Sequence, residues 1–407
     1  MEQREADAAA RTPFAADAQR MLGELVAVRR ELHGAVEVGL DLPATQRILL
    51  RALDGLGLEV AVGSALSSVT AVLRGGRPGP TVLLRADMDG LPVREATGLE
   101  FASTNGAMHA CGHDLHMAGL VGAVRLLAAR RAELPGTVIF MFQPGEEGYA
   151  GGRTMLEEGV LDAAGDRPVA AFAIHVDCVT PRGRVVTREG AMMASASALR
   201  MRLLAAGGHA AFPHLGTDPV PVAAELILAV QSFAARRLPA TDQAVISITR
   251  VSSDSAAGNV LASEVAMEAN IRTLSKETLE AVKANLPALL RGIAEAHGCV
   301  LETEFVESYP VTYNDPAETR FVREVLSALV GDDRVTMLPA PSMASEDFAY
   351  VLDEVPGTLV FVGAEPDGGS GPMHSDRAVF DDSVLDLVAT VHAELAWRRL
   401  EETGRDR

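Results

Sequence analysis

The feature that most limits the folds open to this 407-residue chain is a self-contained β-α-β-β-α-β order in its middle. The expected strands lie at 198–204, 244–251, 263–274 and 300–308, and the expected helices at 219–237 and 276–296. This order is typical of a ferredoxin-like α+β domain. Because the stretch has a complete topology of its own, it predicts a second domain inserted into the first.

The segments on either side of this insertion alternate between apolar strands and helices, which predicts an α/β layer. Apolar runs rich in Val, Ile and Phe predict buried strands at 81–87, 136–144, 169–176 and 358–364. Apolar residues at helical spacing predict helices at 115–131, 318–329 and 383–400. We therefore expect an α/β domain in two parts, 14–192 and 309–403, interrupted by a ferredoxin-like domain at 193–308.

The charge balance excludes two classes of partner. The chain has 55 acidic and 36 basic side chains, a formal net charge of −19. Because it would repel phosphate backbones and anionic lipids, we expect no nucleic-acid partner and no membrane partner. Residues 1–20 lack the pattern of a signal peptide, and no apolar run reaches the roughly 18 residues that a membrane span needs. With three scattered cysteines that form no disulfide framework, the sequence predicts a cytoplasmic globular protein.

Three histidines, a cysteine and an aspartate occupy the eight residues HACGHDLH, from His109 to His116. Cys111 and His113 are two residues apart, so in an extended loop their side chains can point the same way. Thiolate and imidazole bind Zn²⁺, Ni²⁺ or Co²⁺, and less strongly Mn²⁺. The segment is therefore a candidate metal site, with a redox role for Cys111 as an alternative.

Further polar clusters lie at the ends of predicted strands, where open α/β sheets bind their ligands. They are RADMDGLP (85–92), QPGEEGYAGG (143–152), His175 and GPMHSD (371–376). Adjacent carboxylates such as Glu146 and Glu147 repel one another at the end of an apolar strand unless a cation is present. A solvated turn is the alternative for this pair, and a core histidine is the alternative for His175. The hypothesis of a metal site depends on the convergence of all these clusters at one sheet edge.

Six motifs occur in the same order along this chain as in a known enzyme family, and the resemblance covers the chain from about Arg29 to His374. They are RADMDGLP, HACGHDLHMA, QPGEEGYAGG, HAAFPHLGTDPV, SEDFA and MHSD. The chain resembles the N-acyl-amino-acid amidohydrolases, which include the hippurate hydrolases and the auxin-conjugate hydrolases. These enzymes form a branch of the aminoacylase and glutamate-carboxypeptidase family of metallopeptidases.

This resemblance implies two divalent metal ions, with Zn, Mn, Ni and Co all open as their identity. The implied ligands are Cys111, His113, Glu147, His175 and His374. Glu146 would be the general base, since that role needs a carboxylate outside the ligand set. His109 and His116 are expected to support the ligands or the fold. Asp87 and Asp89 are expected either to orient a ligating imidazole or to cap a loop.

In the inserted domain, the resemblance places His209, Asn259 and Arg272 against the substrate. A histidine at position 209 can stabilise the oxyanion of the tetrahedral intermediate and would be a second catalytic residue. Arg272 can bind the free carboxylate of an N-acyl amino acid with its planar guanidinium, although a solvent-facing role is the alternative. In the family this domain is a lid and often a dimer interface, so a homodimer or a higher homo-oligomer is expected.

The chain departs from the family pattern at three places. Ala262 stands where a proline is usual, and Ala269-Asn270-Ile271 stands where Gly-Thr commonly precedes the arginine. The His-x-x-Pro-Glu element is altered to His33-Gly-Ala-Val-Glu37. None of these positions is an expected ligand, so we expect them to affect substrate choice rather than catalysis.

The resemblance therefore implies metal-dependent hydrolysis of the amide bond of N-acyl-L-amino acids, with release of a carboxylic acid and a free amino acid. A metallo-carboxypeptidase or dipeptidase on the same scaffold is the nearest alternative. A metal-containing binding protein without turnover is a third possibility, against which the presence of Glu146 argues.

Overall fold

The computed structural model describes residues 12–405 and divides them into two compact units. Unit 1 contains the chain up to Met192, Tyr313–Ala340 and the residues from Asp347 onward, and unit 2 contains Met193–Thr312 and Pro341–Glu346. Residues 1–11, part of the segment expected to lack a signal peptide, lie outside the described range. Among the described residues, no helix has the length and apolar character needed to cross a membrane.

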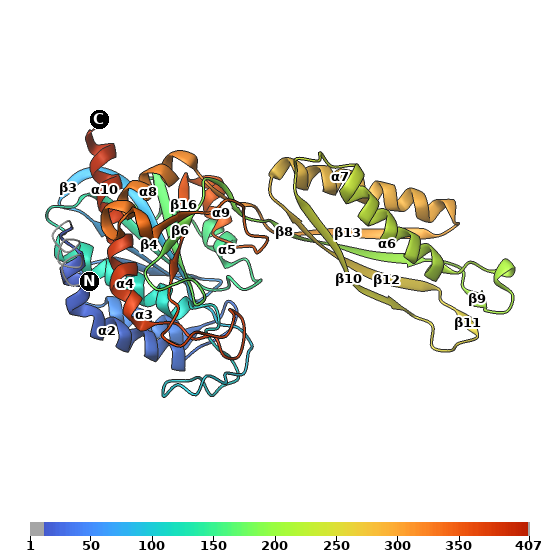
Figure 1. The fold of residues 1–407 in the computed structure, drawn as a ribbon, viewed down its shortest axis with the longest axis horizontal. Helices are drawn as coiled ribbons and strands as arrows, with labels where there is room; N and C mark the ends of the chain where they lie inside the picture. The colour runs from blue at the N-terminus through green and yellow to red at the C-terminus, as the bar shows by residue number, and fades with distance from the viewer. Residues whose placement is uncertain (1–11, 406–407) are drawn as a thin grey trace. The chain divides into compact units, whose positions relative to one another are not determined.

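Unit 1 is built on a mixed sheet of eight strands in the order β1-β2-β4-β3-β5-β16-β6-β15 (Figure 1). Its strands are β1 (Glu59–Val62), β2 (Val69–Arg74), β3 (Arg77–Asp87), β4 (Pro135–Gln143), β5 (Ala170–Asp177), β6 (Val185–Thr187), β15 (Val335–Met337) and β16 (Gly357–Gly363). The four central strands β4, β3, β5 and β16 run parallel. Their carboxyl ends therefore lie along one edge of the sheet, and each predicted polar cluster of unit 1 follows or ends one of these strands or opens the helix after β3.

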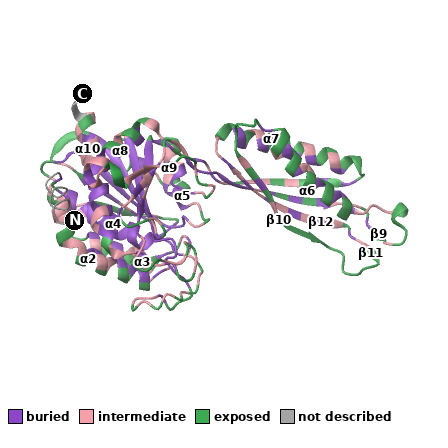
Figure 2. Cartoon of the chain, in the orientation of Figure 1, coloured by how far each residue is buried: buried purple, intermediate pink, exposed green. Residues whose placement is uncertain are grey.

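The helices of unit 1 are α2 (Ala15–Gly34), α3 (Pro43–Leu53), α4 (His113–Ala129), α5 (Gly151–Glu157), α8 (Pro316–Val330), α9 (Ala349–Glu354) and α10 (Leu385–Arg405). Helices α4 and α10 pack against β3 and β5, and α2 packs against both helices. Because α4 is apolar on nearly every side, it lies in the centre of the core, as its colouring in Figure 2 shows. The metal-site motif HACGHDLH opens this central helix.

Unit 2 is a four-stranded antiparallel sheet in the order β10-β12-β8-β13, with two helices. Its elements are β8 (Ala196–Leu204), α6 (Pro219–Arg236), β10 (Ala244–Ser253), β12 (Glu264–Thr273), α7 (Lys276–Ala296) and β13 (Val300–Tyr309). The side chains of Asp218 and Ser275 cap the first turns of α6 and α7 by accepting backbone N–H bonds. Alternate residues of β12 are buried against these helices. The predicted fold class, an α/β domain with an inserted antiparallel-sheet domain, is confirmed.

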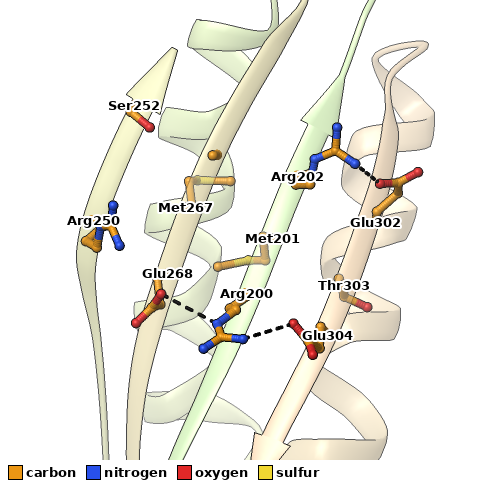
Figure 3. A pocket seen from close by; sticks show the side chains of 11 residues that line it. Arg200, Met201, Arg202, Arg250, Ser252, Met267, Glu268, Glu302, Thr303 and Glu304 are labelled. Carbon is orange, nitrogen blue, oxygen red and sulfur yellow. Dashed lines mark hydrogen bonds and ion pairs between the residues drawn. The ribbon is translucent and has the colours of Figure 1, made fainter. Parts of the chain in front are cut away.

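The face of this sheet that α6 and α7 leave uncovered carries charged side chains. Arg200 lies 3.8 Å from Glu268 and 3.3 Å from Glu304, and Arg202 lies 2.7 Å from Glu302 (Figure 3). These residues line a shallow hollow of about 390 Å³ that contains none of the predicted ligands or catalytic residues. Since both arginines are more than half exposed, the pairs contribute little stability and mark a solvated face.

A buried ion pair joins α2 to the start of α4. Arg29 Nε lies 2.7 Å from Asp114 Oδ2, and both side chains are almost fully buried. His33, one turn further along α2, lies 2.8 Å from the same oxygen through Nδ1 and 3.1 Å from Glu95 through Nε2. The pair holds the first turn of α4, and with it His113, against α2.

We expect Arg29→Met to lower the free energy of unfolding by about 3–5 kcal/mol, because it removes the guanidinium that pairs with the buried Asp114 carboxylate and leaves only His33 beside it. The neighbouring Arg30 is a matched control, since it is 47% exposed and pairs with Asp382 at 2.9 Å. Arg30→Met should cost less than about 1 kcal/mol. Urea unfolding of the two variants measures the difference, and equal losses would contradict a special role for the buried pair.

Candidate metal centre

A glycine with a left-handed backbone turns the chain into α4 and presents the two residues beside it. Gly112 has φ 84°, and a Cβ at this position would lie 2.5 Å from Val176 Cγ2. Only glycine therefore fits both the conformation and the space. Cys111 precedes this glycine, and His113 is the first residue of α4.

The five predicted ligands come from four segments of unit 1 and converge. Sγ of Cys111 lies 3.5 Å from Nε2 of His175 and 3.2 Å from Nε2 of His374. Oε1 of Glu147 lies 3.4 Å from Nε2 of His374 and 4.0 Å from Nε2 of His113.

The donor atoms form two groups that share the thiol. Cys111, His113 and His175 make one group, and Cys111, Glu147 and His374 make the other; within each, the donor atoms lie within 4.8 Å of one another. A third group joins His113 and Glu147 to Glu146. Sulfur, imidazole nitrogen and carboxylate oxygen are ligands for zinc and its neighbours in the first transition row.

Two buried atoms of this cluster lack any hydrogen-bond partner. They are Nε2 of His113 and Oε1 of Glu147, both with almost no exposed surface. The main-chain carbonyl of Asp89 accepts a bond from His113 Nδ1 at 2.8 Å, which leaves Nε2 as a lone-pair donor. Since buried polar atoms are normally satisfied, the pair fits a cation between them.

The electrostatics of the cluster also fit a cation. Burial and the charges of Glu147 and Glu146 raise the pKa of the Cys111 thiol well above its ordinary value. Burial would lower the pKa of His113, but the carboxylates of Asp87, Asp89 and Glu147 raise it to about 10. The buried carboxylates contribute to both shifts. Divalent cations would balance this charge and stabilise the thiolate.

Imidazoles on the strand side of the cluster are fixed by hydrogen bonds. His175 donates from Nδ1 to the carbonyl of Val176 at 2.6 Å, so its Nε2 points at Cys111. His116 donates from Nδ1 to Asp87 Oδ1 at 2.5 Å and accepts the Val176 N–H at 2.8 Å through Nε2. Because both of its nitrogens are used, His116 supports the site without a free ligand atom.

The two aspartates of RADMDGLP have different partners. Asp87 bonds to His116 on one oxygen and to Arg85 on the other, at 2.7 Å, and lies 3.6 Å from His113 Nε2. The carboxylate of Asp89 accepts the backbone N–H of Glu146 at 2.9 Å and of Glu147 at 3.1 Å. Asp89 therefore caps the glutamate loop with its carboxylate, and its main-chain carbonyl orients His113, whose Nδ1 also lies 3.7 Å from Asp89 Oδ1.

His109 and His374 differ sharply in their surroundings. His109 is fully buried, neither ring nitrogen has a partner, and burial lowers its pKa to about 3, so it is a neutral core residue. His374 has a left-handed backbone, φ 64°, which is strained for any residue with a Cβ. Its N–H donates to the Ala110 carbonyl at 3.0 Å, which fixes this loop beside Cys111.

The predicted substrate residues lie in unit 2. Arg272, on β12, donates from Nε to Asn270 Oδ1 at 3.1 Å and from Nη1 to Ser345 Oγ at 2.8 Å. His209, in the short strand β9 (Gly208–His209), is exposed and accepts the Ala211 N–H through Nδ1. Asn259 is also exposed, and its carbonyl accepts the Ala210 N–H.

The sequence patterns assign no role to three further residues of the site. Arg85 and Gln143 are buried at the ends of β3 and β4, and both bond to Asp347. One sequence feature does indicate this network: Arg85 lies inside the apolar run TVLLRAD, and a buried arginine requires acidic partners. Its partner, 262 residues away in the SEDFA motif, could not be deduced from spacing.

Comparisons with known proteins show which family the chain resembles. Residues 83–398 match the sequence model of the Peptidase family M20/M25/M40. The chain is 35% identical over 374 residues to N-acetylcysteine deacetylase of Bacillus subtilis, covering 91% of this chain and 96% of that protein. It is 34% identical over 379 residues to thermostable carboxypeptidase 1 of Saccharolobus solfataricus, covering 91% and 94%.

A solved structure supports the same relationship. The YxeP protein of Bacillus subtilis, described as a dinuclear metal-binding peptidase of the M20 family, aligns with a TM-score of 0.82 at 32% identity. The alignment covers 94% of this chain and 99% of that one.

Cys111 provides a direct test of the metal centre. We expect metal-loaded protein to resist alkylation at Cys111 and chelated protein to react at least tenfold faster, because the metal occupies the thiolate. Cys178 and Cys299 are matched controls, since both are buried and neither belongs to a donor group. Peptide mass spectrometry after timed alkylation measures all three thiols. Equal rates for Cys111 with and without metal would remove it from the ligand set.

Proposed function

Because the chain belongs to the Peptidase family M20/M25/M40, we propose that it hydrolyses the amide bond of N-acyl-L-amino acids with two divalent metal ions. The family makes it a metal-dependent hydrolase of amide bonds. The proposed ligands are Cys111, His113, Glu147, His175 and His374. Zn, Mn, Ni and Co are the candidate metals.

One observation carries the proposal: five donor side chains converge at the sheet edge, and a further carboxylate, Glu146, lies beside them. Two ions bound there would polarise an amide carbonyl and lower the pKa of a water molecule. Hydrolysis also needs a group that removes the proton of this water and returns it to the leaving nitrogen. Glu146 is suited to that task because it is only 7% exposed yet lies next to His113 and Glu147.

We infer the substrate class from the relatives and from Arg272. One relative is a deacetylase of an N-acetyl amino acid, and another is a carboxypeptidase. Substrates of both types carry a free α-carboxylate next to the amide. Arg272 has Nε and Nη1 engaged by Asn270 and Ser345, and its guanidinium can offer further N–H groups to such a carboxylate.

We further propose that unit 2 is a lid. Closure would bring His209 to the oxyanion of the tetrahedral intermediate, with Arg272 on the substrate carboxylate and Asn259 nearby. The chain segments near 192–197 and 307–314 are the proposed hinges. Within the described chain, edge strands β10 and β13 are unpaired on their outer sides, so unit 2 is also the proposed interface of a homodimer or higher homo-oligomer.

The second candidate is a metallo-carboxypeptidase or dipeptidase that uses the same site, and the carboxypeptidase relative favours it. A screen separates the two. The full-length protein is loaded with each metal in turn and given N-acetyl, N-benzoyl and indole-acyl amino acids beside dipeptides, with released amine as the readout. A kcat/KM at least tenfold higher for the acyl amino acids supports the proposal. A preference for dipeptides would replace it, and no turnover of either would support a binding protein.

Substitution of the two adjacent glutamates should affect turnover and metal binding differently. We expect Glu146→Gln to keep both metals and to lower kcat by about 10²-fold or more, as removal of a general base does. Glu147→Gln should instead lose metal, because it removes a ligand. Metal content by mass spectrometry and steady-state kinetics give both quantities. Full metal content in Glu147→Gln, with metal loss in Glu146→Gln, would exchange the two roles.

Arg272→Ala should raise KM at least tenfold for N-acyl amino acids but less than threefold for the matching amides, which lack the carboxylate. Arg250→Ala is the matched control, since Arg250 lies on the neighbouring strand β10 of the same sheet and has no proposed role. Kinetics on acid and amide pairs measure the effect. An equal loss on acids and amides would place the carboxylate anchor elsewhere.

A further inference from the structure

Unit 1 contains a buried polar network to which the proposed reaction assigns no part. It consists of Arg85 from β3, Gln143 from β4 and Asp347, which lies just before α9. Arg85 donates from Nε to Gln143 Oε1 at 2.9 Å and from Nη2 to Asp347 Oδ1 at 2.8 Å. At most 2% of any of the three residues is exposed.

The carboxylate of Asp347 is held on both oxygens. Gln143 Nε2 lies 2.8 Å from each of them, and Oδ2 also accepts the N–H of Gly152 at 2.9 Å. Together with Arg85, these protein groups donate two hydrogen bonds to each carboxylate oxygen of Asp347. All four acceptor sites of this carboxylate are occupied by these donors, so Asp347 is satisfied by protein groups.

The main chain of the anchored Asp347 contacts the carboxylate of Glu146. The backbone N–H of Asp347 points at Oε1 of Glu146 at 3.4 Å. The backbone N–H of Glu146 is itself held by the carboxylate of Asp89 at 2.9 Å. Glu146 is therefore restrained at its main chain from the β3 side and at its carboxylate from the α9 side.

We propose that Asp347, anchored by Arg85 and Gln143, is a positioning residue that sets the orientation of the Glu146 carboxylate. This inference rests on the proposed function, since it gives Asp347 a purpose only if Glu146 acts as the base. The physical reason is geometric: a general base must lie within hydrogen-bond reach of the proton it removes, and a displacement of about 1 Å can cost about 10²-fold in rate. The contact between Arg85 and Asp87, at 2.7 Å, joins the same anchor to the side chain that holds His116.

The test is a double-mutant cycle in the full-length, metal-loaded protein. Asp347→Asn is isosteric, but its amide group turns one acceptor into a donor facing Gly152 or Gln143, which should displace the backbone of residue 347. We expect kcat to fall about 10–100-fold, KM to change less than threefold, and both metals to stay bound. In the Glu146→Gln background the same substitution should lower kcat less than threefold further, because the group that it positions is gone.

A buried acid elsewhere in unit 1 is the control for a general loss of structure. Glu318 is buried and pairs with Arg399 of α10 at 2.7 Å, outside the network. Glu318→Gln should lower the urea midpoint without changing kcat more than twofold. If Asp347→Asn does not fold, Gln143→Leu replaces it, since it removes two of the four bonds to Asp347 and should lower kcat in the same Glu146-dependent way.

The outcomes separate this inference from the proposed function. If Glu146→Gln is inactive while Asp347→Asn has wild-type kcat, or loses the same factor in both backgrounds, Asp347 is structural and the inference is wrong. Loss of metal in Asp347→Asn overturns it too. If Glu146→Gln itself keeps full kcat, the assignment of the base fails, and the positioning inference fails with it.

Discussion

The structure of unit 1 depends on how it balances negative charge that is buried at one sheet edge. Five carboxylates gather near the carboxyl ends of β3 and β4: Asp87, Asp89, Glu146, Glu147 and Asp347. Arg85 contacts two of them, and backbone N–H groups and an imidazole satisfy others. What is left is an unpartnered carboxylate oxygen facing an unpartnered imidazole nitrogen, with a thiol between further imidazoles. Isolated buried charges are too costly to persist, so the fold implies cations at this place.

Parallel strands explain why such a centre forms from residues that are far apart in the sequence. The clusters after β3, β4, β5 and β16 reach the same edge because these strands point the same way. Each loop is then fixed by a local device: Gly112 at the turn into α4, Asp89 on the glutamate loop, and a strained His374 tied to Ala110. Protein contacts therefore hold the loops that carry the donor atoms, and such preorganisation lowers the entropic cost of binding.

Periodicity and local chemistry were enough to predict the inserted domain and the convergence of the polar clusters at one sheet edge, whereas the choice of the five donors within those clusters came from the family resemblance. The predicted order of strands and helices in the inserted domain matches the observed order because each element has its own hydrophobic pattern. The predicted helix at 276–296 has the same ends as the observed one. The convergence of the clusters was expected from the strand ends. The features that could not be predicted depend on contacts between distant segments: the Arg29–Asp114 pair and the bond of Asp347 to Arg85. The sequence patterns also carried no expectation for α2, α3 or the short strands β6 and β15, which owe their place to packing and to the sheet edge.

The departure from the family pattern before Arg272 acquires a physical meaning in unit 2. Where Gly-Thr is common, this chain has Asn270, and its amide oxygen accepts a bond from Arg272 Nε. Ser345, from the SEDFA motif, accepts a second bond from Nη1. Two neutral acceptors orient the guanidinium without cancelling its charge, as a carboxylate would. Burial lowers the pKa of Arg272, so an anion bound beside the guanidinium would stabilise its charged form. The change at position 270 therefore concerns the surroundings of the proposed carboxylate anchor, Arg272, and none of the five proposed metal ligands.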